Sequence, residues 1–116
     1  MQARNFNVAE FTCKCGKCGT PKMDAVFVAM LDNARDHAGV PFVITSGYRC
    51  QEHNKAEGST AQNHPSGKAV DIQCTEGPKR IKIVMGLIRA GFRRIGVAKT
   101  FIHADSMDDI ESMWFY

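Results

Sequence analysis

The chain has 116 residues, of which 44% are hydrophobic and 23% are charged, and its formal net charge is +3. This length is enough for one compact domain with a single hydrophobic core and too short for two, so we expect one domain over residues 1–116. No apolar run approaches the ~20 residues that span a bilayer, which disfavours membrane insertion. The N-terminal stretch MQARNFNVAEF lacks the apolar centre of a secretory signal peptide.

The basic residues are concentrated in one stretch of the chain. Between Pro78 and Lys99 there are seven basic residues and no acidic one. The simpler interpretation is a solvated helix face, and the alternative is attraction to an anionic polymer such as nucleic acid or cell wall. Aromatic side chains do not alternate with these charges before Phe92, so a stacking platform for nucleic acid is poorly supported. We expect no nucleic-acid partner.

The first half of the chain predicts one long helix followed by a strand. Apolar residues within 26–34 recur at spacings of three and four, which is typical of a helix packed on a core. Thr20 and Pro21 suit the start of this helix, and Gly39 suits its end. The apolar run 41–46 predicts a buried strand that follows the helix.

The remaining patterns predict a mixed set of short elements. In chain order these are a short helix at 50–57, a polar loop at 58–67, a strand at 68–73, a second helix at 78–91, and strands at 94–98, 101–105 and 112–116. The apolar face expected for the second helix comprises Ile81, Val84, Leu87 and Ile88. Because helices and strands do not alternate regularly, we expect an α+β domain with a mainly antiparallel sheet flanked by helices. Trp114 in the last strand is expected to pack in the core.

The stretch HPSGKAVDI, residues 64–72, carries the first two candidate metal ligands. His64 ends the polar loop, and Asp71 lies inside the strand that follows. Aspartate is unfavourable in a strand interior, and an ionised carboxylate near a core needs a partner such as a metal ion.

The run FIHAD, residues 101–105, supplies a third candidate, because His103 and Asp105 share one face of a strand. Two histidines and one carboxylate form a ligand set typical of catalytic zinc, which activates water for attack at neutral pH. Spacing alone leaves an alternative open. In that alternative His64 is an ordinary loop residue, Asp71 accepts hydrogen bonds at a turn, and His103 is a satisfied core histidine.

Four segments together resemble the zinc D-Ala-D-Ala peptidase family. They are SGYRC at 46–50, HN at 53–54, HPSGKAVDI at 64–72 and RIGVAKTFIHAD at 94–105. The closest resemblance is to small single-domain members from tailed phages and prophages. The family includes D-Ala-D-Ala carboxypeptidases, vancomycin-resistance dipeptidases and phage L-alanyl-D-glutamate endolysins, and the amino-terminal domain of Hedgehog shares its fold. The resemblance covers most of the chain and implies a Hedgehog/DD-peptidase-like fold.

The resemblance also implies roles for individual residues. The zinc ligands would be His64, Asp71 and His103, and Arg49 would hold the substrate carboxylate or the scissile carbonyl. A guanidinium suits this task because it offers a planar fork of donors. The alternative for Arg49 is an ordinary ion pair at the protein surface, without a role in substrate binding.

The chain departs from the family pattern at two positions. Gln62 stands where serine is usual, and Thr100 stands where better-known members carry the carboxylate or histidine that acts as general base. Threonine cannot take a proton at neutral pH. The remaining candidates for the base are Asp105 and, less favoured, His53. Asp105 would equally well orient a metal ligand.

The run FTCKCGKCG resembles a zinc knuckle, since Cys13, Cys15 and Cys18 follow one another at spacings of two and three. Structural zinc takes four ligands, and Cys50 or Cys74 could supply the fourth. A structural zinc, a disulfide to Cys50 and free thiols all stay open. We include this segment, residues 10–20, in the single domain. A cysteine protease is disfavoured, because no motif places a histidine base beside a cysteine.

These observations lead to one principal expectation and one alternative. The principal expectation is a zinc peptidase that hydrolyses peptidoglycan, as a D,D-carboxypeptidase or as an endopeptidase of stem peptides or cross-links. It would be phage- or prophage-encoded, monomeric, made in the host cytoplasm, and active at the cell wall after release or as part of a virion. It would bind one catalytic Zn²⁺, with a second, structural Zn²⁺ if the cysteines bind metal. The alternative is an inactive, zinc-stabilised structural or binding domain of the same fold.

Overall fold

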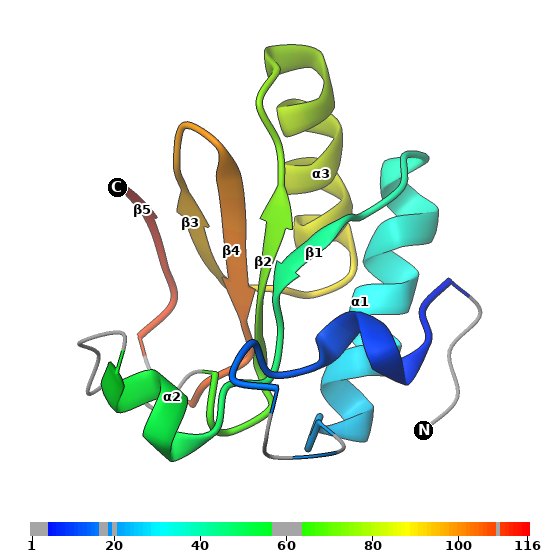
Figure 1. The fold of residues 1–116 in the computed structure, drawn as a ribbon. Coiled ribbons are helices and arrows are strands. Elements are labelled where there is room, and N and C mark those ends of the chain that lie inside the picture. Colours follow the sequence, from blue (N-terminus) through cyan, green and yellow to red (C-terminus); the bar gives the residue numbers. More distant parts are fainter. Residues whose placement is uncertain (1–4, 17–18, 20, 57–63, 109) are drawn as a thin grey trace.

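The fold is described from a computed structural model, which covers residues 5–16, 19, 21–56, 64–108 and 110–116 (Figure 1). The elements in chain order are a 3₁₀ helix η1 (Val8–Phe11), α1 (Ala25–Ala38), β1 (Ile44–Ser46), α2 (Gln51–Ala56), β2 (Ala69–Gln73), α3 (Gly77–Arg89), β3 (Arg94–Val97), β4 (Phe101–Asp105) and β5 (Ser112–Phe115). All the predicted elements are therefore present, although several bounds differ by a few residues. The strand predicted as buried at 41–46 is shorter and, as β1, partly exposed, so that part of the prediction was wrong. Within the described part of the chain, no helix is long and apolar enough to cross a membrane.

The strands form one sheet in the order β1-β2-β4-β3-β5. Every neighbouring pair is antiparallel except β3 and β5, which run parallel. The helices α1 and α3 lie together on one side of this sheet (Figure 1). This arrangement confirms the predicted α+β class with a mainly antiparallel sheet, and it is compatible with a Hedgehog/DD-peptidase-like fold.

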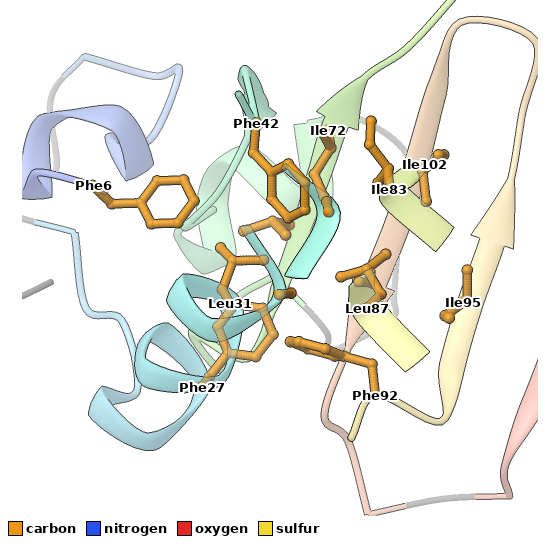
Figure 2. Close-up of a cluster of buried hydrophobic side chains, with 14 of the residues drawn as sticks. Phe6, Phe27, Leu31, Phe42, Ile72, Ile83, Leu87, Phe92, Ile95 and Ile102 are labelled. Carbon is orange, nitrogen blue, oxygen red and sulfur yellow. The ribbon is translucent and has the colours of Figure 1, made fainter. Parts of the chain in front are cut away.

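The hydrophobic core lies between the two long helices and the sheet. Phe27 and Leu31 of α1 face Leu87 of α3, and isoleucines from β2, β3 and β4 close the cluster (Figure 2). Phe27 and Phe92 meet edge to face, with ring centroids 5.6 Å apart. Each such side chain contributes about 1.5–3 kcal/mol when fully buried. One face of the sheet therefore packs against α1 and α3, and the other face is available for polar side chains.

The first long helix begins later than the sequence predicts. Asp24, and not Thr20, caps it, because the Asp24 carboxylate accepts a hydrogen bond from Phe27 N–H at 2.9 Å. The Asp24 N–H donates to the carbonyl oxygen of Gly67 at 2.9 Å, which ties the helix start to the loop before β2. Pro21 precedes the helix, and Thr20 lies outside the described residues. The helix ends at Gly39 in a left-handed conformation, as predicted.

The buried face of α3 differs in part from the prediction, since Leu87 is buried and Val84 packs against the core as predicted, but the other two residues do not. The structure buries Ile83, Gly86 and Leu87, whereas Ile81 and Ile88 are 57% and 43% exposed. Both stripes have helical spacing, so the apolar pattern alone does not choose between them. The choice follows from Gly86, where a Cβ atom would lie only 2.6 Å from a backbone oxygen of α1. The missing side chain at Gly86 therefore allows α1 and α3 to approach closely at this position.

Candidate metal centre

The register of the sheet brings the candidate ligands together on the face away from α1 and α3. Asp71 of β2 lies directly opposite His103 of β4, and His103 lies opposite Gly96 of β3. Residues that lie opposite each other in neighbouring strands project from the same face. Ile102 and Ala104 alternate with His103 and belong to the hydrophobic core, so His103 points the other way.

His64 reaches this centre from the loop before β2. Its main-chain oxygen accepts hydrogen bonds from Gly67 N–H at 3.1 Å and Arg49 N–H at 3.4 Å, which fix the loop. Its Nδ1 lies 2.8 Å from the carbonyl oxygen of Gly47. A carbonyl only accepts, so Nδ1 carries the proton and donates. The lone pair therefore remains on Nε2, which lies 3.7 Å from Oδ2 of Asp71.

The electrostatic environment keeps His64 neutral. Burial lowers its pKa below the ordinary value, and the positive charge of Arg49 contributes in the same direction. The carboxylate of Asp71 and the Gly47 carbonyl oppose this shift only in part. A neutral imidazole with a lone pair directed at a carboxylate is the form that binds a metal ion.

His103 lies between two carboxylates. Its Nδ1 is 3.0 Å from Oδ1 of Asp71, and its Nε2 is 2.7 Å from Oδ2 of Asp105. Burial alone would lower the pKa of His103, but the hydrogen bonds to Asp105 and Asp71 outweigh burial, so the pKa is raised. With its proton on Nε2, directed at Asp105, the ring presents the Nδ1 lone pair to Asp71 and His64.

The donor set and its spacing fit a zinc ion. One ligand atom from each of His64, Asp71 and His103 lies within 4.8 Å of the other two. Two imidazole nitrogens and a carboxylate oxygen are typical zinc ligands. The contact between His103 Nδ1 and Asp71 requires either a second proton or a cation between the two atoms, and a metal ion meets that need. The structure thus brings together the three residues that the resemblance implied.

Asp105 lies behind His103 and is fully buried. Its Oδ2 accepts from His103, while its Oδ1 accepts from Arg94 Nε at 2.7 Å and from Met107 N–H at 3.1 Å. Burial alone would raise the pKa of Asp105, but the hydrogen bonds from His103 and Arg94 outweigh it and lower the pKa. The carboxylate is therefore ionised, with both oxygens engaged by donors.

Arg49 lies at the edge of the centre. Its guanidinium donates to Ser46 Oγ at 3.2 Å and to Asn54 Oδ1 at 3.4 Å. The structure places Thr100 in the exposed turn before β4. Gln62 lies outside the described residues, as does the side chain of His53, so the structure does not describe the second base candidate.

The pattern analysis assigned Trp114 to the core, and this was wrong. Its side chain is half-buried on the face that carries His103, with the two ring centroids 5.6 Å apart. The guanidinium carbon of Arg94 lies 5.4 Å from the centre of the Trp114 ring, within cation–π range. Sequence reasoning also missed Arg94 as the partner of Asp105. The alternation of β3 carried that signal, because it places Arg94 and Gly96 on the same face.

The cysteines form a second cluster. The Sγ atoms of Cys13 and Cys15 each lie 3.7 Å from Sγ of Cys50. No disulfide joins these residues in the described part of the chain. Cys74 is not part of the cluster, since its thiol lies in the core and donates to Glu76 O at 3.5 Å. Cys18 lies outside the described residues.

The fold and the site define a small α+β domain with a two-histidine, one-carboxylate centre of the kind that zinc hydrolases use. The model of one protein family, described as Peptidase M15, matches residues 4–105. The chain therefore belongs to the peptidase M15 family, which consists of zinc peptidases, and this confirms the resemblance to the zinc D-Ala-D-Ala peptidases. No curated protein matches the chain significantly.

Proposed function

We propose that this protein is a zinc-dependent peptidase that hydrolyses peptide bonds in bacterial peptidoglycan. The observation that carries the proposal is the convergence of His64, Asp71 and His103 within 4.8 Å. In both histidines the second ring nitrogen is already occupied, by the Gly47 carbonyl and by Asp105 respectively. Zinc, when bound, would polarise the scissile carbonyl and activate water.

Other residues of the chain would orient the ligands and the substrate. Asp105 would hold His103 in the tautomer that leaves Nδ1 available, since both of its oxygens already accept hydrogen bonds. This favours an orienting role for Asp105 over the role of general base. Arg49 would bind the substrate carboxylate or carbonyl through its guanidinium fork. Trp114 would provide an apolar side to the centre beside His103.

The choice of peptidoglycan as substrate rests on the resemblance to wall-lytic members and on the basic stretch that ends at Lys99, which suits an anionic wall. D,D-Carboxypeptidase, stem-peptide endopeptidase and cross-link endopeptidase activities use the same ligands. We extend the proposal to a phage- or prophage-encoded monomer that reaches the wall after release from the host cytoplasm or within a virion.

The competing function is an inactive domain stabilised by zinc. The observation that favours it is Thr100, since no proton acceptor stands at the position of the usual base three residues before His103. In that case the three ligands would hold a metal for stability alone. His103→Ala would then lower the free energy of unfolding without abolishing any hydrolysis.

Three defined muropeptides distinguish these functions. The zinc-loaded protein is incubated with a stem pentapeptide ending in D-Ala-D-Ala, with a tetrapeptide that lacks this terminus, and with a cross-linked dimer. Mass spectrometry then identifies the bond that is cut, and His64→Ala serves as the inactive control. Cleavage of any of the three by the wild-type protein alone supports the peptidase. A protein that holds zinc at the histidine centre and cleaves none of them is the binding domain.

A further inference from the structure

We propose a second, structural zinc site formed by Cys13, Cys15 and Cys50, separate from the histidine centre. One sulfur atom from each residue lies within 4.8 Å of the other two. Cys13 is 2% exposed, and the other two cysteines are half-buried. The proposal goes beyond the peptidase function, because these residues supply no ligand to the histidine centre.

The sulfur spacing matches a thiolate metal site. In a tetrahedral site with Zn–S bonds of about 2.3 Å, neighbouring sulfur atoms lie about 3.8 Å apart. Cys50 Sγ lies 3.7 Å from the sulfur of Cys13 and 3.7 Å from that of Cys15. A disulfide requires sulfur atoms about 2.05 Å apart and would join Cys50 to only one of these two partners. Two equal contacts to one sulfur therefore fit a shared metal ion better than a covalent pair.

The local chemistry also suits a metal thiolate. The main-chain N–H of Cys50 donates to Cys13 Sγ at 3.4 Å, and such a donor stabilises negative charge on sulfur. Soft thiolate ligands select zinc over hard cations such as Mg²⁺ or Ca²⁺. Binding converts each thiol to a thiolate, so three cysteines release up to three protons to solvent for each zinc ion bound. The three described residues leave the fourth position unassigned.

The cluster connects two parts of the chain that are distant in sequence. Cys13 and Cys15 follow η1, whereas Cys50 lies at the end of the loop from β1 and immediately before α2. Tyr48 N–H donates to the Phe11 carbonyl oxygen at 2.9 Å, which continues the same contact. In Figure 1 the segment after η1 runs beside this loop.

The same loop supplies two groups to the histidine centre. Gly47 accepts the hydrogen bond from His64 Nδ1, and Arg49 directly precedes Cys50. A metal at the cysteines would therefore restrain Cys50 at the end of the loop that contacts His64 through Gly47 and that carries Arg49. The cysteine site would act on stability and on the ordering of the loop, and it would take no part in the chemistry.

The test counts zinc ions per chain by elemental mass spectrometry after purification under a phosphine reductant. We expect two for wild type and one each for Cys50→Ala and Cys15→Ala. Cys74→Ala is the matched control, since it removes a thiol outside the cluster, and it should retain two. If both cluster variants bind as many zinc ions per chain as wild type does, the proposal is overturned.

Cobalt substitution provides a readout that depends neither on peptidase activity nor on the folding of a cysteine variant. His64→Ala loaded with Co²⁺ should show the near-ultraviolet charge-transfer absorption of thiolate ligands, and wild type should show it with the same intensity. Absence of this band from both proteins would overturn the cysteine site. A mass two hydrogens lower before reduction, with no cobalt band afterwards, would establish a disulfide instead. Loss of the histidine-bound zinc in His64→Ala tests the proposed peptidase separately.

Discussion

Gly96 leaves the space through which the indole of Trp114 reaches His103. The two residues lie opposite each other in β3 and β5, and a Cβ atom on Gly96 would lie 2.5 Å from the indole Nε1. His103 is the next residue in this row, on the far side of Gly96. Neighbouring strands are about 4.8 Å apart, so the indole spans the gap between β5 and β4 only because β3 has no side chain there.

Gly96→Ala should therefore displace Trp114 from His103. A methyl group forced into this contact should lower the free energy of unfolding by about 1–3 kcal/mol. Trp114 is the only tryptophan of the chain, so its fluorescence reports this displacement directly. Chemical denaturation followed by fluorescence measures both effects.

The matched control for this substitution is Gly77→Ala. A Cβ atom at Gly77 meets nothing within 4 Å, and the residue is the first of α3. Its emission spectrum should equal that of wild type, and its free energy of unfolding should be unchanged or higher by up to about 1 kcal/mol, because alanine has less freedom than glycine in the unfolded chain. Identical spectra for Gly96→Ala and wild type would show that the indole does not depend on the missing side chain.

The sequence predicted the class of fold and the three candidate ligands, because these depend on local pattern and on motif. Alternation in FIHAD placed His103 and Asp105 on one face, and the structure has that arrangement. The buried stripe of α3 was not predictable, because two apolar stripes compete and Gly86 decides between them through contact with another helix. The helix start was misjudged because Asp24 competes with Thr20 as a cap.

The partners of the ligands could not be read from the sequence for a related reason. Whether Asp105 is a base or an orienting group depends on what meets its two oxygens, and Arg94 lies eleven residues away on a different strand. The position of Trp114 depends on β5 pairing parallel with β3, which is a long-range choice. The contacts of Asp105 and the position of Trp114 therefore both depend on which strands pair in the sheet, and local sequence pattern does not determine this pairing.

Asp105→Ala should weaken zinc binding by about 10- to 100-fold, because His103 loses the acceptor that fixes its tautomer. Arg94 would also lose its partner at 2.7 Å, so the protein should become less stable by about 3–5 kcal/mol. Competition with a chromophoric chelator measures the affinity. Asp108→Ala, an exposed carboxylate three residues further on, is the control and should bind zinc as wild type does. Unchanged zinc affinity together with lost hydrolysis would instead assign Asp105 as the general base.

Zinc affinity should fall as the pH is lowered from about 7 to about 5. The pKa of His103 is raised in the metal-free protein, so a proton occupies the Nδ1 position before zinc does. Zinc must displace this proton, and its apparent affinity should drop about tenfold per pH unit once the pH is below that raised pKa. The pKa of His64 is lowered, mainly by burial, so His64 takes up a proton at lower pH than His103 does. Calorimetric titration in buffers of different ionisation enthalpy counts the released protons.

Asp105→Ala tests the origin of this pH dependence. It removes a hydrogen bond that raises the pKa of His103, so the inflection in the plot of zinc affinity against pH should move to lower pH. An inflection at the wild-type pH would show that Asp105 does not raise the pKa of His103.

Arg49→Lys should lower kcat/KM for the cleaved muropeptide by about 10- to 100-fold while the zinc content stays the same. The lysine keeps the charge but loses the planar fork, and hydrogen bonds to charged groups contribute about 1.5–3 kcal/mol each. Loss of ground-state binding would appear in KM, whereas loss of contact with the scissile carbonyl would appear in kcat. Arg89→Lys, on the exposed last turn of α3, is the control and should leave both constants unchanged.

If Arg49→Lys retained full kcat/KM, Arg49 would be a structural residue that only holds Ser46 and Asn54. The substrate carboxylate or carbonyl would then have to be bound by a different donor near His64.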